Sequence, residues 1–180
     1  MAFYINKTQI IIEYSFLLVI AFTLLSGSYN ILYVILFSSL HETAHLISLL
    51  LFKGDVKRIR IAFYGMGLEY KANLSFICEL LFLISGVTVN FAISALNIFR
   101  EINYSLAIIN LLPLYPLDGG RALKLILNKL FNLNVSDLVF RIISFAFIAA
   151  MIIYIAVTRN IQLLIITIYI IVFSFNNTTD

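Results

Sequence analysis

The segment Ile31–Phe52, ILYVILFSSLHETAHLISLLLF, decides how this chain folds. It is apolar on both sides of its centre and long enough to cross a bilayer as a helix, which takes about 20 residues. Its centre, HETAH at residues 41–45, contains the only two histidines of the chain. Residues four apart lie on one face of a helix, about one turn from each other. The two imidazoles can therefore take two corners of a tetrahedral zinc site, with Glu42 beside the metal and able to accept a proton from water.

The composition indicates a polytopic membrane protein. The chain is 62% hydrophobic and only 12% charged, with a mean hydropathy of +1.04, whereas a soluble domain carries about 25% charged residues. The net charge of +3 and the pI near 9.0 do not indicate a nucleic-acid partner, because the basic residues cluster beside apolar segments and membrane topology explains them better. The single cysteine, Cys78, excludes an internal disulfide and a cysteine-rich zinc site.

Apolar segments predict about six membrane crossings. The fourth is shorter than the others and is interrupted by Pro113 and Pro116, and a stretch with amphipathic spacing, Ala122–Phe131, follows it. The six spans are predicted at Ile10–Ser26, Ile31–Phe52, Phe76–Phe99, Tyr104–Leu117, Leu138–Val157 and Ile161–Phe175.

The basic residues predict how these spans are oriented. Six crossings place both termini on the same side of the membrane. That side holds ten of the twelve Lys and Arg residues, and the opposite side holds only Arg100 and Arg159. Because Lys and Arg are enriched in cytoplasmic loops, we expect a multi-pass protein of the cell membrane with both termini in the cytoplasm.

The predicted fold class is an all-α polytopic membrane protein, with residues 1–180 forming a single membrane-embedded domain whose core lies at about 31–121 and with no appended soluble regulatory domain. Lys53–Asn73 is the exception to the helical pattern. Residues 56–64 partly alternate between apolar and polar, and a glycine-containing turn follows, so we predict a small β-hairpin beside the membrane. The alternative is an ordinary basic loop held at anionic headgroups.

A catalytic zinc needs a third protein ligand and one open position for water. No further histidine is available, so we expect a carboxylate. Asp118 is the first candidate, because it follows a proline-broken apolar segment and precedes two glycines, and broken backbone at membrane depth is tolerated only inside protein or beside a wet cavity. The alternative for Asp118 is that it only caps the following helix. Glu69 is the second candidate, although its surroundings have no helical pattern.

Three motifs occur in one order along the chain: HETAH at residues 41–45, GVTVN at 86–90 and NLLPLYPLDGGR at 110–121. Together they resemble the site-2 protease family of intramembrane zinc metalloproteases, and are similar to its bacterial branch that includes stage IV sporulation protein FB. Val87 departs from the pattern, because the family often has proline there.

The resemblance implies a role for each motif. It implies that His41, His45 and Asp118 bind zinc and that Glu42 is the general base. It implies that Asn90 binds substrate near the reacting carbonyl, with a helix–helix hydrogen bond as the alternative. It also suggests that the hairpin predicted within Lys53–Asn73 pairs with substrate as an added strand.

The expected function is that of a zinc metalloendopeptidase that cleaves a membrane-spanning or membrane-associated protein near the cytoplasmic face. The expected partners are this substrate and the lipid bilayer, with a regulatory membrane partner as a further possibility, and no nucleic acid. The alternative is a non-catalytic membrane scaffold or metal-binding protein derived from a protease. It is less favoured, because such a protein is expected to have lost Glu42 or a metal ligand, and none is missing.

Overall fold

The computed structural model describes residues 1–5, 8–27, 29–62, 65–71 and 73–159, together with 164, 167, 168 and 171. The chain divides into two compact units, Met1–Ile108 and Ile109–Asp180, and each is described by itself.

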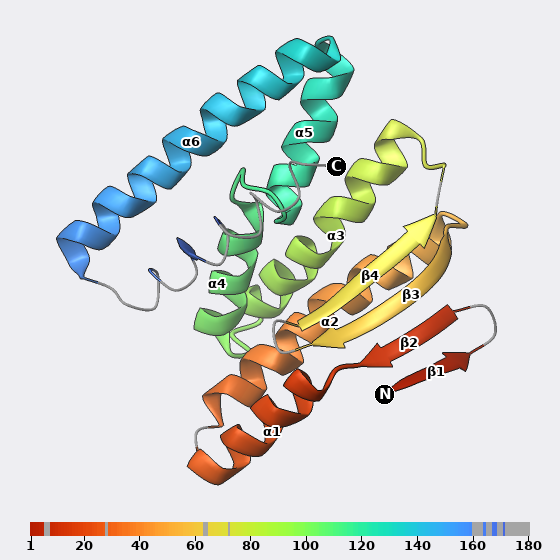
Figure 1. The fold of residues 1–180 in the computed structure, drawn as a ribbon, viewed down its shortest axis with the longest axis vertical. Coiled ribbons are helices and arrows are strands. Elements are labelled where there is room, and N and C mark those ends of the chain that lie inside the picture. The colour runs from red at the N-terminus through yellow and green to blue at the C-terminus, as the bar shows by residue number, and fades with distance from the viewer. Residues whose placement is uncertain are drawn as a thin grey trace. The chain divides into compact units, whose positions relative to one another are not determined.

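The first unit contains a four-stranded sheet in the order β1-β2-β3-β4 (Figure 1). Its strands are β1 (Ala2–Ile5), β2 (Thr8–Ile12), β3 (Asp55–Ala62) and β4 (Gly65–Lys71). The pairs β1–β2 and β3–β4 are antiparallel, whereas β2 and β3 run parallel. The antiparallel β3–β4 pair confirms the hairpin predicted within Lys53–Asn73.

The prediction of an all-α chain with a first span at Ile10–Ser26 was wrong at its beginning. Thr8–Ile12 forms strand β2, and helix α1 covers only Tyr14–Ser26. A short run of isoleucines suits a strand as well as a helix, and β-branched residues favour the strand. Pairing with β3 decides the outcome, and it leaves α1 shorter than the roughly 20 residues that a membrane span needs.

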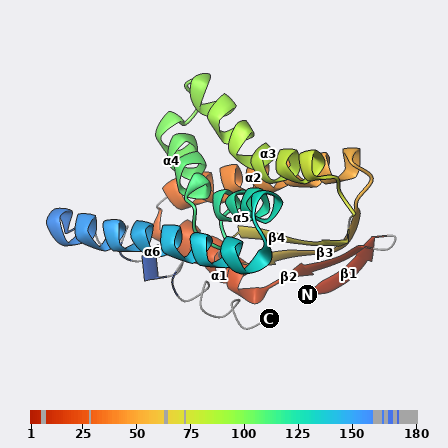
Figure 2. The ribbon, with the colours of Figure 1, turned by 90° about the horizontal axis from the view of Figure 1, so that it is seen from above.

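Helices α2 (Asn30–Leu51) and α3 (Phe76–Ala95) pack side by side, with β4 next to α2 (Figures 1 and 2). The buried side chains of each helix recur every three or four residues, and so lie along one face. On α2 they are Phe37, His41, His45 and Leu49; on α3 they are Phe82, Leu83, Gly86, Val87, Asn90 and Ser94. The predicted histidine helix is therefore confirmed, and both histidines belong to its buried face.

Helix α4 (Arg100–Leu111) begins in the first unit and ends at the start of the second. It stops two residues before Pro113, because proline has no backbone N–H to continue the helix and disfavours helical backbone before it. The predicted fourth span, Tyr104–Leu117, is thus a short helix followed by irregular backbone.

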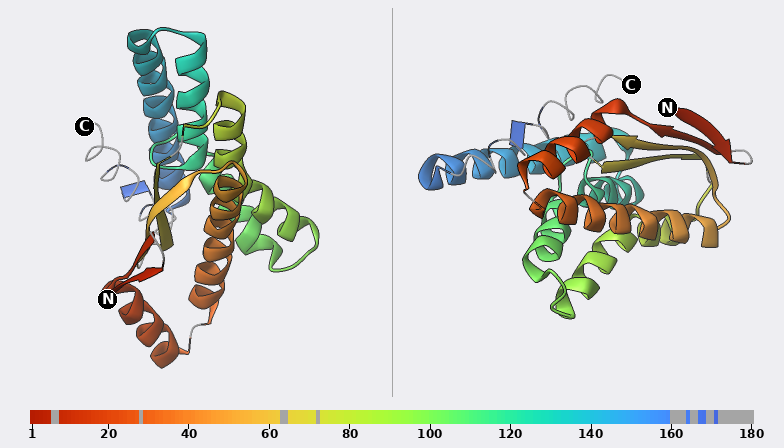
Figure 3. Two further views of the ribbon diagram at one scale, coloured as in Figure 1. Left: turned by 90° about the vertical axis from the view of Figure 1, so that its right-hand side faces the viewer. Right: turned by 90° about the horizontal axis from the view of Figure 1, so that it is seen from below.

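The second unit is built on an antiparallel pair of helices, α5 (Asp118–Leu130) and α6 (Leu133–Thr158) (Figure 3). Near the connection, Lys124 contacts Asp137 and the Ser136 hydroxyl donates a hydrogen bond to Asn128. The amphipathic stretch predicted at Ala122–Phe131 corresponds to α5.

Among the described residues, three helices are long and apolar enough to cross a membrane: α2, α3 and α6. The last predicted span, Ile161–Phe175, lies mostly outside the described residues. The structure thus gives a mostly helical fold with three helices of membrane length, and the count of six crossings stays a prediction.

Candidate metal centre

The two histidines of the HETAH motif lie on the face of α2 that meets α3. Their side chains are almost fully buried, with 3% of His41 and 4% of His45 exposed. The Nε2 atoms of the two rings lie 3.1 Å apart, and the ring planes are nearly perpendicular. The i and i+4 spacing thus brings two potential ligand atoms together, as the sequence predicted.

Helix α3 holds His45 in one tautomer. The His45 Nδ1 atom lies 2.7 Å from the carbonyl oxygen of Phe82, with the Ser85 hydroxyl at 3.1 Å. A carbonyl can only accept a hydrogen bond, so Nδ1 must carry the proton and donate it. In the neutral ring, the Nε2 atom of His45 therefore presents a lone pair towards His41.

His41 is held by a side chain of α3. Its Nδ1 atom lies 2.6 Å from Oδ1 of Asn90, whose side chain is fully buried. The amide nitrogen of Asn90 donates in turn to Oδ1 of Asn103 on α4, at 3.0 Å. Hydrogen bonds of this kind, from the far ring nitrogen to a fixed acceptor, orient histidines that bind metals.

The donor set fits a zinc ion. For Zn–N bonds of about 2.05 Å, two ligand atoms at tetrahedral corners lie about 3.3 Å apart. The observed 3.1 Å between the two Nε2 atoms is close to this value. A cation between them could bind both Nε2 atoms.

Gly86 on α3 leaves open the space beside the two rings. A Cβ atom added at Gly86 would lie 2.5 Å from Nε2 of His41 and 2.6 Å from Nε2 of His45, where real Cβ contacts essentially never occur. Any larger residue at this position would fill the place next to both ligand atoms. The glycine of the GVTVN motif is therefore required by the geometry around the histidines.

Glu42 follows His41 on α2 and is partly buried. Its position on the same helix as both histidines is the one that the HETAH motif predicted. Unlike them it is not part of the fully buried stripe; one residue further along the helix, its side chain lies about 100° round the axis from that of His41.

Asp118, in the second unit, is the first residue of α5. The N-cap of this helix is Leu117, so the interpretation of Asp118 as the capping residue was wrong. Close packing of the following glycines fixes its backbone: Cβ atoms at Gly119 and Gly120 would overlap the backbone of Leu111 and Leu114.

Glu69, the second candidate for the third ligand, lies on β4 and forms ion pairs with arginines of β3. Its carboxylate accepts two hydrogen bonds from Arg58, at 2.8 and 3.1 Å, and lies 3.8 Å from Arg60. The Glu69 side chain is 52% exposed, whereas both histidines are buried. Its partners and exposure therefore favour a surface ion pair over a metal ligand.

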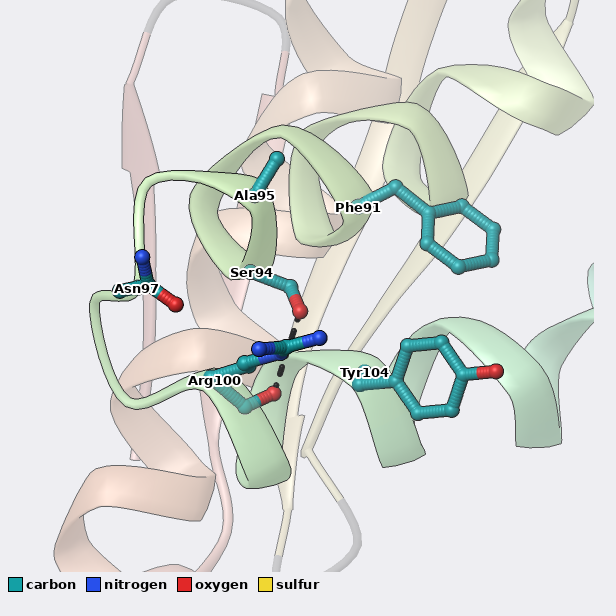
Figure 4. Close-up of a pocket in the computed structure, with 6 residues that line it drawn as sticks. All are labelled: Phe91, Ser94, Ala95, Asn97, Arg100 and Tyr104. Atoms are coloured by element: carbon teal, nitrogen blue, oxygen red, sulfur yellow. Dashed lines mark hydrogen bonds between the residues drawn. The ribbon is translucent and has the colours of Figure 1, made fainter.

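A cavity of about 330 Å³ lies where α3 turns into α4 (Figure 4). Six residues line it: Phe91, Ser94, Ala95, Asn97, Arg100 and Tyr104. This lining has no histidine and no carboxylate, so the cavity is separate from the candidate metal centre.

The sequence did not single out Asn103. It lies between the predicted spans Phe76–Phe99 and Tyr104–Leu117, yet its side chain is fully buried. Its burial depends on contact with Asn90, thirteen residues earlier on another helix. An asparagine at the beginning of an apolar helix was the available signal, and that signal is weak.

Comparisons with known proteins agree with this picture. Residues 72–154 match the model of Peptidase family M50. This segment includes Asn90 and Asp118 and begins after the two histidines. The comparison with curated proteins gave no match.

The structure is similar to that of the Site-2 Protease from Methanocaldococcus jannaschii. The match has a TM-score of 0.69 and 20% sequence identity, and it covers 98% of this chain and 94% of that one. At this identity the similarity shows the fold. Residues 72–154 of the chain thus match peptidase family M50, and the chain has the fold of a site-2 protease.

Proposed function

We propose that this chain is an intramembrane zinc metalloendopeptidase that cleaves a membrane-spanning or membrane-associated protein near the cytoplasmic face. The pair of buried imidazoles on α2 carries the proposal, because two Nε2 atoms 3.1 Å apart lie on a helix long and apolar enough to span a membrane. Ionisable groups in such helices are energetically costly and mark functional sites. The M50 match and the site-2 protease fold support the same function.

We infer that Asp118 is the third ligand. His41, His45 and Asp118 together offer two imidazole nitrogens and one carboxylate oxygen. This set suits catalytic zinc, which takes three protein ligands and leaves one position open. The ion pairs of Glu69 with Arg58 and Arg60 further favour Asp118.

When bound, zinc would supply a Lewis acid that polarises the scissile carbonyl and lowers the pKa of water. The residues of the chain do the rest. His41 and His45, held by α3, fix the place of reaction on α2. Glu42 accepts the proton of the attacking water and passes it to the leaving amine, which is general base and then general acid catalysis.

The substrate must present extended backbone, because a helix hides its peptide bonds within its own hydrogen bonds. Strand β4 supports this part of the proposal: it forms one edge of the sheet and lies next to α2. An extended segment could pair with this edge as an additional strand. Placement of both termini in the cytoplasm follows from the distribution of basic residues, and a role in sporulation rests on the motif resemblance alone.

Measurement of zinc per chain tests the proposed ligands. Wild type, Asp118→Ala and Glu69→Ala are purified in detergent, and their zinc is measured after dialysis. We expect about one zinc per chain in wild type and Glu69→Ala, and loss of zinc in Asp118→Ala. Loss only in Glu69→Ala would instead identify Glu69 as the ligand. Absence of zinc from folded wild type would favour the non-catalytic scaffold.

A further inference from the structure

Beneath the histidines, two buried asparagines form a chain of hydrogen bonds from α2 to the turn between α3 and α4. Asn90 links His41 to Asn103, and both asparagine side chains are fully buried. The amide nitrogen of Asn103 lies 3.1 Å from the carbonyl oxygen of Ile98 and 3.3 Å from that of Phe99. All the residues joined by these hydrogen bonds lie in the first unit.

Backbone carbonyls of the turn between α3 and α4 determine which way the Asn103 amide is oriented. The carbonyls of Ile98 and Phe99 can only accept hydrogen bonds, so the side chain of Asn103 must turn its NH₂ group towards them. Its oxygen then faces Asn90 and accepts from it. The orientation of the Asn103 amide is thus set by backbone, independently of any metal.

The orientation of Asn103 in turn determines the orientation of Asn90 and the tautomer of His41. Because Asn103 presents an oxygen, Asn90 must turn its own NH₂ group to Asn103 and its oxygen to His41. An amide oxygen can only accept, so Nδ1 of His41 must carry a proton. In the neutral ring this leaves the Nε2 atom unprotonated, 3.1 Å from Nε2 of His45, as a metal ligand requires.

We propose that Asn103 is a positioning residue: through Asn90, it fixes the tautomer of His41 with the proton on Nδ1 and none on Nε2, as metal binding requires, before any metal arrives. This inference rests on the proposed metal site and adds Asn103, which hydrogen-bonds to Asn90 rather than to a proposed metal ligand. Asn90 is then better explained as the link that orients His41 than as a substrate contact, because both ends of its amide are already bonded.

The turn between α3 and α4, whose carbonyls bind Asn103, is stabilised by a further hydrogen bond. The hydroxyl of Ser94 donates to the carbonyl oxygen of Arg100, at 3.2 Å, across the turn (Figure 4). Asn97, on the same turn, is exposed and has a left-handed backbone with φ of 58°. Asn97 does not take part in the hydrogen bonds that join His41, Asn90 and Asn103. Replacement by glycine preserves its left-handed backbone, so Asn97→Gly is a matched control.

Nitrogen NMR of the metal-free protein tests the inference directly. The chain has two histidines, so ¹⁵N-histidine labelling gives only four ring-nitrogen signals. In detergent at mildly alkaline pH, we expect both wild-type rings to carry their proton on Nδ1. A wild-type His41 protonated on Nε2 would overturn the proposal, and that result needs no variant.

Variants then test the part played by Asn103. In Asn103→Ala the amide of Asn90 can turn over, so we expect His41 to populate the other tautomer. His45 should stay unchanged, because its Nδ1 donates to the Phe82 carbonyl. Asn97→Gly should resemble wild type, because it leaves every hydrogen bond between His41, Asn90 and Asn103 in place. An unchanged His41 in folded Asn103→Ala would overturn the proposal.

Cobalt titration, followed by the visible spectrum, gives a second readout. Loss of support behind a ligand typically weakens metal binding by about 10–100-fold, and we expect this range for Asn103→Ala against Asn97→Gly. Equal affinities of the two variants would contradict the role of Asn103. The two proposals fail differently. If wild-type His41 carries its proton on Nδ1 but the protein binds no metal, the metalloprotease proposal is refuted. If the protein binds metal but His41 populates both tautomers, only the positioning role of Asn103 is refuted.

Discussion

Substitution of Gly86 by alanine is the sharpest test of the histidine geometry. The added methyl carbon would lie 2.5 Å from Nε2 of His41 and 2.6 Å from Nε2 of His45, against at least 3.4 Å for ordinary contact. About 0.9 Å must therefore be made up by moving the rings or separating α2 from α3. The rings cannot turn away easily, because Asn90 and the Phe82 carbonyl hold their Nδ1 atoms.

The size of this displacement decides the expected result. Metal–ligand distances tolerate deviations of about 0.2 Å, so a shift several times larger should remove at least one imidazole from the metal. We expect Gly86→Ala to retain far less than one zinc per chain after dialysis against a chelator. Overpacking of a close interface costs about 1–3 kcal/mol in unfolding free energy, which leaves room for the variant to fold.

The assay measures zinc per chain and thermal unfolding side by side. Gly67→Ala on β4 is the matched control, because a Cβ atom there meets its nearest neighbour only at 3.9 Å. It should keep wild-type zinc. A folded Gly86→Ala that binds zinc as tightly as wild type would show that the rings do not lie against α3 as described.

Three further outcomes are expected. Glu42→Gln should keep its zinc while hydrolysis of fluorescently labelled casein falls by about 10²–10⁴-fold, the usual contribution of a general base; robust cleavage would remove Glu42 from that role. Glu69→Gln should lower unfolding free energy by about 1 kcal/mol or less, because its ion pair with Arg58 is exposed; a large loss in chemical denaturation would contradict this. Reporters attached to the N-terminus and to the C-terminus of the full chain should both report the cytoplasm; opposite locations would refute six crossings, and two extracytoplasmic signals would refute the predicted orientation.

The sequence predicted the parts of the fold that depend on local pattern. The HETAH spacing predicted a shared helix face, and residues 41 and 45 do lie on one buried stripe of α2. Alternation within Lys53–Asn73 predicted the β3–β4 hairpin, because a period-two pattern is a local signal. The glycine turn predicted after residue 64 was wrong, because Gly65 and Gly67 belong to β4 and pair with β3.

The rest depended on contacts between distant segments. Ile10–Ile12 lie in a strand that pairs with β1 on one side and, on the other, with β3, more than forty residues later. Asn103 became part of the candidate site only because Asn90 lies beside it on another helix. Neither pairing leaves a periodic pattern in the sequence, so apolar character alone assigned the isoleucines to a membrane span and polarity alone assigned Asn103 to a turn.

The parallel pairing of β2 with β3 also constrains how the chain is threaded through the bilayer. Strand β2 directly precedes α1, and β3 directly follows α2. Since the two strands are hydrogen-bonded neighbours, the beginning of α1 and the end of α2 lead to the same sheet. If α2 crosses the bilayer as proposed, the segment that includes α1 must carry the chain from this sheet to the opposite side first. In that case β2 and β3 can pair only when α2 returns the chain to the side of the sheet, so a complete sheet requires one direction of insertion for the histidine helix.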